Sequence, residues 1–282
     1  MPDAIPPSAT ILVFDSGMGG LTVFREIAAA RPDARYVYVA DDAAFPYGRM
    51  PEDALIARVR DVIGRAIAQH APDLVVVACN TASTLALADL RAHFAVPFVG
   101  TVPAIKPACA QSATRHIAVL GTLATVGREY TRALIREFAG SCAVTLVGSP
   151  RLAAIAEAEL AGTPVADAEI AAEIAPCFVE TDDRRIDAVV LACTHYPLLL
   201  ARFRPLAPWP VDWIDPAPAI ARRVSDLLRG RAPAGGTAPV PAIEFTSGRA
   251  PSPALAAALA RFGFPGGQTP LAARFDTRAP TP

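Results

Sequence analysis

Two cysteines in this sequence lie in contexts that could do chemistry. Cys79 and Cys193 each follow an apolar run and precede polar residues, and the two contexts resemble each other over nine residues, DLVVVACNT at 73–81 and DAVVLACTH at 187–195. A thiol at the end of a strand and the start of a helix lies near the positive end of the helix dipole, which can bring its pKa from about 8.5 into the range of about 3.5–7.5. We therefore predict two reactive thiols; the alternative is that both are ordinary buried cysteines.

His195 follows Cys193 by two residues and is one of four histidines in the chain. An imidazole can polarise or protonate a neighbouring group near neutral pH. Two thiols in equivalent positions favour a pair of opposed acid and base groups, which would remove a proton from one face of a carbon and return one to the other face. A Cys–His hydrolase, which would form a covalent thioester through a single indispensable cysteine, stays open as an alternative.

Two further polar loops follow predicted strands. The glycine-rich segment at 15–20 presents Asp15, Ser16 and backbone N–H groups, and a second loop contains Asp41 or Asp42 followed by Pro46-Tyr47-Gly48. Either loop could contribute to a small polar pocket, and turn chemistry alone is an equally good interpretation of each.

Motifs for the common cofactors do not accompany these residues. The segment DSGMGG at 15–20 matches neither the dinucleotide-binding nor the P-loop pattern. The chain has one lysine, Lys106 between Ile105 and Pro107, and its five cysteines form no C-x-x-C pair. We therefore expect no cofactor, no zinc or other metal site and no disulfide framework.

The elements that must position these residues alternate along the chain. Short apolar runs, typical of strands buried on both faces, recur between alanine-rich stretches such as 51–70 and 166–181. Helices are also expected at 84–94 and 254–262. The alternation predicts an α/β fold with doubly wound parallel sheets. The predicted strands are Thr10–Asp15, Tyr36–Ala40, Leu74–Ala78, Pro97–Gly100, His116–Gly121, Val144–Val147, Ala188–Ala192 and Ala242–Thr246.

A second internal match indicates two related modules. The run ILVFDS at 11–16 resembles IAVLGT at 117–122, 106 residues later, and the two cysteine segments are 114 residues apart. Two matches at nearly the same offset favour two similar α/β modules. Because ligands in open α/β sheets bind beyond the carboxyl ends of the strands, both cysteines are expected at such a binding edge.

Composition excludes several functional classes. The chain has 282 residues, 52% hydrophobic and 19% charged, which suggests about two folded domains. A net charge of −1 and the lack of a Lys/Arg-rich run argue against nucleic acid as the main partner. No stretch reaches the roughly 18 apolar residues of a membrane span. Free cysteines and an N-terminus without a leader pattern predict a cytoplasmic protein, and residues 265–282 resemble a frayed tail.

Taken together, the motifs resemble those of the glutamate racemase family. They occur in the family's order and cover about residues 10 to 265. Cys-Thr-His-Tyr-Pro distinguishes this family from its aspartate racemase relatives, whose second motif resembles Cys-Thr-Glu. The matching pieces are Asp15–Thr22, Pro46–Gly48, Ala78–Ser83, Thr122–Thr125 and Cys193–Leu198.

The resemblance implies a cofactor-independent, two-base proton transfer that interconverts L- and D-glutamate and supplies D-glutamate for peptidoglycan. It implies that Cys79 is the base toward D-glutamate, assisted by Asp15, and that Cys193 is the base toward L-glutamate, assisted by His195. Glu157 matches the family's acidic residue near that histidine. The substrate contacts implied by the resemblance are Asp15, Ser16, Tyr47, Gly48, Asn80, Thr81, Thr194 and His195, with Thr122 and Thr125 as further candidates.

The family's domain arrangement, carried over to this chain, places residues 1–100 and 211–282 in one domain and 101–210 in the other, with the active site between them. It implies glutamate as the small-molecule partner, and a homodimer is compatible because family members form differing dimers. A related racemase acting on aspartate or another small acid, and a binding module on the same scaffold, stay open as alternatives. The departures from the family pattern, which remove no proton-transfer group, are Ser149, Ala192 and Gly127.

Overall fold

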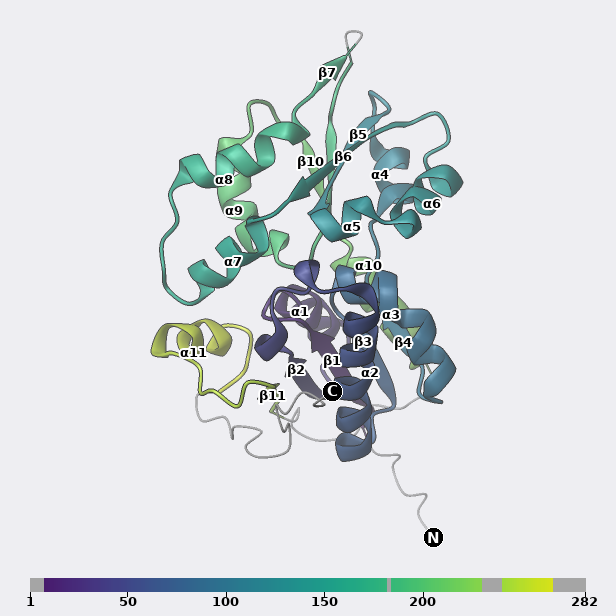
Figure 1. The fold of residues 1–282 in the computed structure, drawn as a ribbon, viewed down its shortest axis with the longest axis vertical. Coiled ribbons are helices and arrows are strands. Elements are labelled where there is room, and N and C mark those ends of the chain that lie inside the picture. The colour runs from purple at the N-terminus through teal and green to yellow at the C-terminus, as the bar shows by residue number, and fades with distance from the viewer. Residues whose placement is uncertain (1–7, 182–183, 230–239, 266–282) are drawn as a thin grey trace.

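The computed structural model describes residues 8–181, 184–229 and 240–265, which form two larger sheets flanked by helices (Figure 1). The strand order is β11-β2-β1-β3-β4 in the first sheet and β10-β9-β5-β6 in the second, and every pairing in both is parallel. The first sheet contains β1 (Thr10–Asp15), β2 (Arg35–Ala40), β3 (Leu74–Val77), β4 (Phe98–Gly100) and β11 (Ala242–Phe245). The second contains β5 (His116–Thr122), β6 (Ala143–Ser149), β9 (Ala188–Ala192) and β10 (Asp212–Ile214).

The two sheets repeat one topology. The order β2-β1-β3-β4 in the first corresponds to β6-β5-β9-β10 in the second, so β1 matches β5 and β3 matches β9. These are the strand pairs whose sequences resemble each other, with Cys79 and Cys193 just after β3 and β9. The predicted α/β class with two parallel sheets is therefore confirmed.

Helices cover both faces of each sheet. The helices of the first half are α1 (Leu21–Ala30), α2 (Glu52–His70), α3 (Asn80–His93), α10 (Ala217–Leu227) and α11 (Pro253–Ala260). Those of the second half are α4 (Ile105–Gln111), α5 (Leu123–Gly127), α6 (Glu129–Phe138), α7 (Leu152–Leu160), α8 (Asp167–Ile174) and α9 (Leu200–Leu206).

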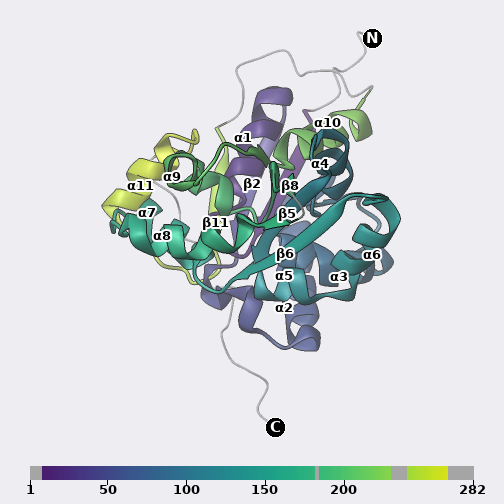
Figure 2. The same ribbon diagram turned by 90° about the horizontal axis from the view of Figure 1, so that it is seen from above.

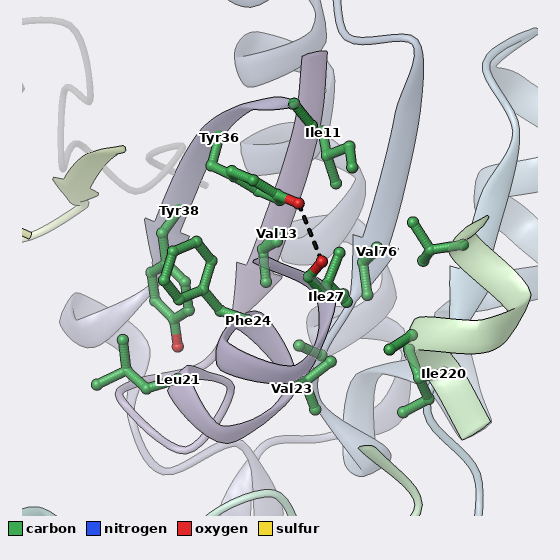
Figure 3. Close-up of a cluster of buried hydrophobic side chains, with 14 of the residues drawn as sticks. Ile11, Val13, Leu21, Val23, Phe24, Ile27, Tyr36, Tyr38, Val76 and Ile220 are labelled. Carbon is green, nitrogen blue, oxygen red and sulfur yellow. Dashed lines mark hydrogen bonds between the residues drawn. The ribbon is translucent and has the colours of Figure 1, made fainter. Parts of the chain in front are cut away.

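The uninterrupted apolar strands are explained by these two covered faces. In β1, Ile11 and Val13 pack into the cluster with α1 and α10, whereas Leu12 and Phe14 pack into the cluster with α2 and α3. Successive side chains alternate because the side-chain period of a strand is two. Figure 3 shows the first cluster, where the hydroxyl of Tyr36 donates a 3.1 Å hydrogen bond to a backbone carbonyl of α1.

Two element boundaries differ from those predicted by four residues or more. The helix expected over 166–181 is wrong at its end, because α8 stops at Ile174 and Pro176 lies in the next turn. Proline in a helix interior removes a hydrogen bond and clashes with the preceding turn. The end of that stretch forms β7 (Glu180–Thr181), paired antiparallel with β8 (Arg184–Arg185). Helix α3, by contrast, begins earlier than predicted, at Asn80 rather than at residue 84.

The two sheets and their helices lie one above the other along the long axis of the molecule. In Figure 1 the second half is above the first, and in Figure 2 β5 and β6 overlie the first half. Strand β10 pairs with β9, whereas α10 packs against α1, so the chain returns to the first half after Ile214. The division at 100/101 and 210/211 stays a prediction, and β10 (Asp212–Ile214) pairs within the second sheet.

Some sequence predictions fall outside the described residues. These are most of the proline- and glycine-rich linker at 230–241 and the tail after Pro265. Within the ranges that the structure describes, none of the helices is both long and apolar enough to cross a membrane.

Candidate active site

A small pocket lies where loops after the strands of both sheets meet. It receives Ser16 from the loop after β1, the polar residues that follow β3, and the polar residues that follow β9. The structure thus brings together most of the predicted site residues, and the complete lining is Ser16, Phe45, Pro46, Tyr47, Gly48, Cys79, Asn80, Thr81, Thr122, Ala153, Cys193, Thr194 and His195.

Cys79 is the N-cap residue of α3. Its Sγ accepts a hydrogen bond from the Ala82 N–H at 3.5 Å and donates to Ser16 Oγ at 3.6 Å. The side chain is 5% exposed. Burial, followed by the charge of Asp15, raises the pKa of the Cys79 thiol to about 12. The expectation that the helix terminus lowers this pKa is therefore wrong for the free protein, because desolvation and a nearby carboxylate outweigh the dipole.

Asp15 ends β1 and lies beneath the pocket rather than in its lining. It is completely buried, and its Oδ2 accepts hydrogen bonds from the N–H groups of Gly17 at 3.0 Å and Gly20 at 3.1 Å. Burial raises the pKa of Asp15, although the charge of His195 and the two backbone donors oppose that effect. A carboxyl group that retains its proton more readily than usual is thereby held next to the Cys79 side of the pocket.

Cys193 has a different partner. Its Sγ lies 3.8 Å from Nδ1 of His195, and Nε2 of His195 lies 2.7 Å from Oε1 of Glu157 on α7. Burial by itself lowers the pKa of His195, but hydrogen bonds to Cys193 and Glu157 and the charges of both raise it well above its usual value. A protonated ring would donate from both nitrogens, one toward the thiol and one toward the carboxylate.

The glycine-rich turn at residues 15–20 of the first half packs against His195 and Glu157 of the second half. Glu157 Oε1 also accepts a 2.6 Å hydrogen bond from the Met18 N–H. A Cβ on Gly17 would lie 2.3 Å from Glu157 Oε1, and a Cβ on Gly19 would lie 2.4 Å from Nδ1 of His195. The glycines of this segment thus permit a close approach of the two halves, which explains a glycine-rich turn that lacks a nucleotide motif.

Polar groups suited to carboxylate binding line the pocket together with the two thiols. Both amide atoms of the Asn80 side chain are buried without a hydrogen-bond partner among the described residues. The hydroxyl of Thr81 lies 3.4 Å from the hydroxyls of Thr122 and Thr125, and the latter two are 2.9 Å apart. Buried polar atoms without partners are costly, so the Asn80 amide is available for a ligand.

Sequence reasoning missed two lining residues, Phe45 and Ala153. The ring centroid of Phe45 lies 5.4 Å from that of His195. Phe45 lies in the polar loop that the sequence had indicated, next to the Pro46-Tyr47-Gly48 motif, so its position gave a signal, whereas Ala153 gave none. Among the described residues, no three His, Cys, Asp or Glu side chains gather as a metal-ligand set.

Comparison with known proteins identifies relatives along most of the chain. The model of the Asp/Glu/Hydantoin racemase family matches residues 18–224. The chain is 58% identical over 228 residues to a glutamate racemase of Brucella canis, which covers 80% of this chain and 82% of that protein.

Solved structures give the same result. The crystal structure of Escherichia coli glutamate racemase, in complex with L-glutamate and the activator UDP-MurNAc-ala, is similar with a TM-score of 0.82 and 39% identity, over 92% of this chain and 96% of that chain. Glutamate racemase isoform RacE1 from Bacillus anthracis is similar with a TM-score of 0.78 and 26% identity, over 95% of this chain and 100% of that chain.

Proposed function

The chain belongs to the Asp/Glu/Hydantoin racemase family, and from that membership we propose that it interconverts L- and D-glutamate as a glutamate racemase. The 58% identity to a glutamate racemase supports glutamate as the substrate. We further propose that the reaction uses two thiols without a cofactor, and that its product supplies D-glutamate for peptidoglycan. The observation that carries the mechanism is one pocket lined by Cys79 from the first half and Cys193 from the second.

In the proposed reaction, each thiol serves one face of the α-carbon. For L-glutamate, the Cys193 thiolate removes the α-proton and the Cys79 thiol donates its proton to the opposite face, giving D-glutamate. Cys193 then holds a proton and Cys79 is a thiolate, which is the form that removes the α-proton of D-glutamate in reverse. The proton count balances in each direction, and the pair must return to its first form before another L-glutamate reacts.

The carboxyl and imidazole groups beside the thiols are proposed to assist these transfers. His195, held by Glu157, favours a thiolate at Cys193 because a cation next to a thiol stabilises its charged form. Asp15 is buried on the Cys79 side, and we propose that it assists proton exchange at that thiol. Assistance by positioned acids and bases is typically worth about 10²–10⁴ in rate.

Substrate binding is proposed for the polar lining. Ser16, Asn80, Thr81 and Thr194 offer hydroxyl and amide donors for carboxylates, together with the loop at Tyr47 and Gly48 and the ring of His195. Such donors also stabilise the negative charge that develops next to the α-carbon when its proton leaves. A pocket that excludes water makes these interactions stronger than they would be in bulk solvent.

A substrate profile tests the proposed function. Purified protein, treated with a chelator and kept reduced, is incubated separately with L-glutamate, D-glutamate and L-aspartate, and the enantiomers are separated by chiral chromatography. We expect both glutamate enantiomers to approach a 1:1 mixture without added cofactor, and L-aspartate to change far more slowly. Faster racemisation of L-aspartate, or none of glutamate by folded protein, would contradict the proposal. The free cysteines lead us to propose a reducing, cytoplasmic location as well.

A further inference from the structure

The loop after β2 forms a wall of the pocket that reaches both halves of the molecule. Its residues Phe45 to Gly48 all line the pocket, and the Phe45 ring lies against His195 of the second half. A Cβ on Gly48 would lie 3.8 Å from the Cβ of Thr122, also of the second half. A shift of this wall would therefore change the pocket both next to Cys193 and His195 and next to Thr122.

A buried carboxylate outside the pocket lining holds this wall. Asp41 directly follows β2 and is completely buried. Its Oδ2 accepts hydrogen bonds from the Tyr47 hydroxyl at 2.5 Å and from Nε of Arg58 at 2.9 Å. Its Oδ1 accepts from Nη2 of Arg58 at 2.6 Å and from the hydroxyl of Thr246 at 2.6 Å. Four donors from the wall, α2 and the residue after β11 thus converge on one side chain.

Tyr47 connects Asp41 to the pocket, because it lines the pocket and its hydroxyl donates a hydrogen bond to Asp41. The Tyr47 side chain is 2% exposed, and its ring centroid lies 6.4 Å from that of Phe14 in the core. The Asp41 N–H also donates a 2.8 Å hydrogen bond to the carbonyl of Asp15, so the backbone of Asp41 is attached to the end of β1. A charged acceptor with four donors makes shorter and stronger hydrogen bonds than neutral groups do.

The neighbouring carboxylate provides a natural contrast. Asp42 accepts hydrogen bonds from the Ser247 N–H at 2.9 Å and the Ser247 hydroxyl at 2.5 Å, and it lies 3.5 Å from the Thr246 hydroxyl. These hydrogen bonds tie the beginning of the loop to the segment after β11, whose residues Thr246 and Ser247 are not among those that line the pocket. The two adjacent aspartates therefore differ in whether they reach the wall.

We propose that Asp41 is a positioning residue for racemisation, which fixes the wall at Phe45–Gly48 through the Tyr47 hydroxyl and Arg58. This inference rests on the proposed function for its kinetic consequences. It also gives the segment after β11 a part in supporting the site, because Thr246 completes the carboxylate's set of donors.

The kinetic signature follows from the symmetry of the reaction. Two enantiomers have equal free energy, so kcat/KM must be the same in both directions for every variant. Variants can therefore be distinguished by whether a loss in kcat/KM comes from a lower kcat or from a higher KM. A displaced wall weakens binding of ground state and transition state alike, which raises KM and leaves kcat largely unchanged. The KM values for both enantiomers should then rise by the same factor.

The test compares Asp41→Asn, Tyr47→Phe and their double variant, with Asp42→Asn as the matched control. An asparagine at 41 would turn an N–H₂ donor toward groups that are themselves donors, and the phenylalanine removes only the hydroxyl. We expect each single variant to raise both KM values about five- to tenfold with kcat within about twofold, on the scale of one lost charge-assisted hydrogen bond. The double variant should be no worse than the more affected single variant, because the two groups act as one unit.

A second readout does not depend on the substrate. The alkylation rate of Cys193 by iodoacetamide should rise several-fold in Asp41→Asn and Tyr47→Phe, because a loosened wall admits the reagent, and it should stay at the wild-type rate in Asp42→Asn. Unchanged KM values and an unchanged alkylation rate in Tyr47→Phe would overturn the proposal even if Asp41→Asn failed to fold. Wild-type protein that does not racemise glutamate, but whose alkylation rates follow the expected pattern, would refute the proposed function and leave the role of Asp41 standing.

Discussion

Cys79 and Cys193 occupy corresponding positions in the two sheets, yet their electrostatic surroundings are opposite. Cys79 follows β3, which pairs with β1, and Cys193 follows β9, which pairs with the corresponding strand β5; their exposed fractions are similar, 5% and 7%. Burial and the charge of Asp15 keep the proton on Cys79 by raising its pKa to about 12. Cys193 instead faces His195, whose pKa is raised well above its usual value. The repeated fold therefore places Cys79 and Cys193 at equivalent positions but in different charge environments.

This difference suggests the resting form of the proposed enzyme. In the proposed reaction, the form that accepts L-glutamate has the proton on Cys79, in agreement with the raised pKa of this thiol, and a protonated His195 beside Cys193. In that reaction the proton has left Cys79 after one conversion to D-glutamate, and the raised pKa of Cys79 favours return to the resting form. The two halves are thus symmetric in geometry and asymmetric in where the proton lies.

The largest expected effect comes from removing either thiol. Cys79→Ala and Cys193→Ala should each reduce racemisation by at least about 10³-fold, since each removes a group that must transfer a proton in both directions. Chiral chromatography measures the rate, and circular dichroism checks the fold. Cys177→Ala is the control, because Cys177 is a fully buried thiol packed in the second half and outside the pocket lining. Near-normal activity in either active-site variant would remove that thiol from the mechanism.

The asymmetry of the resting form can be measured by alkylation. At pH 8 a thiol with a pKa of about 12 is ionised to about one part in ten thousand, and the thiolate is the reactive form. We expect brief iodoacetamide treatment of the free protein to modify Cys193 at least about tenfold faster than Cys79, as followed by peptide mass spectrometry. Since the two side chains are almost equally exposed, equal rates would mean that the electrostatic comparison is wrong.

Substitutions of the assisting carboxyl groups should increase the primary isotope effect for different enantiomers. Asp15→Asn weakens the Cys79 side, so the primary isotope effect on kcat should increase for α-deuterated D-glutamate. Glu157→Gln weakens the support of His195, so the increase should occur with α-deuterated L-glutamate. Each variant should lose about 10- to 100-fold in kcat/KM, equally in both directions. Isotope effects that respond identically in the two variants would place both carboxyl groups on the same side of the reaction.

The smallest effect concerns stability. Burial raises the pKa of Asp15, so its folded form holds the proton more tightly than the unfolded chain does. Wild-type stability therefore falls, relative to Asp15→Asn, as pH rises above about 3.8 toward the folded pKa, by at most about 1.4 kcal/mol per pH unit. Urea denaturation midpoints at pH 4 and pH 7.5 should show Asp15→Asn gaining on the wild type at the higher pH.

Asp187 is a contrasting control for this measurement. Burial raises its pKa, but hydrogen bonds from Ser112, Ala113 and Thr114 outweigh burial and lower the pKa overall. Its contribution to stability is present above the unfolded pKa of about 3.8 and is lost as pH falls through the lower folded pKa. Asp187→Asn should therefore lose stability relative to wild type as pH rises toward 7.5, which is the opposite trend to that of Asp15→Asn. If the stability of both variants relative to wild type changed in the same direction with pH, the assignment of a raised pKa to Asp15 would be wrong.

Much of this arrangement could be predicted from the sequence because its patterns are local. The buried strands are continuous apolar runs, and the internal match placed Cys79 and Cys193 at equivalent strand ends. Strand β10 was not predicted because its three residues give too short a pattern. The charge around Cys79 could not be predicted, since it depends on how deeply Asp15 is buried. The anchor at Asp41 depends on donors from residues 58 and 246, which are far apart in the sequence.

The central claim, that two thiols on opposite faces exchange protons with the α-carbon, is tested most directly by label transfer in D₂O. Wild-type protein is incubated with L-glutamate in D₂O, and early samples are separated into enantiomers and analysed by mass spectrometry. We predict that the D-glutamate first formed carries one deuterium at the α-carbon while the remaining L-glutamate stays almost unlabelled, because the proton removed and the proton returned come from different groups. D-Glutamate that retains the original α-proton, or L-glutamate that gains deuterium as fast as D-glutamate appears, would contradict the account.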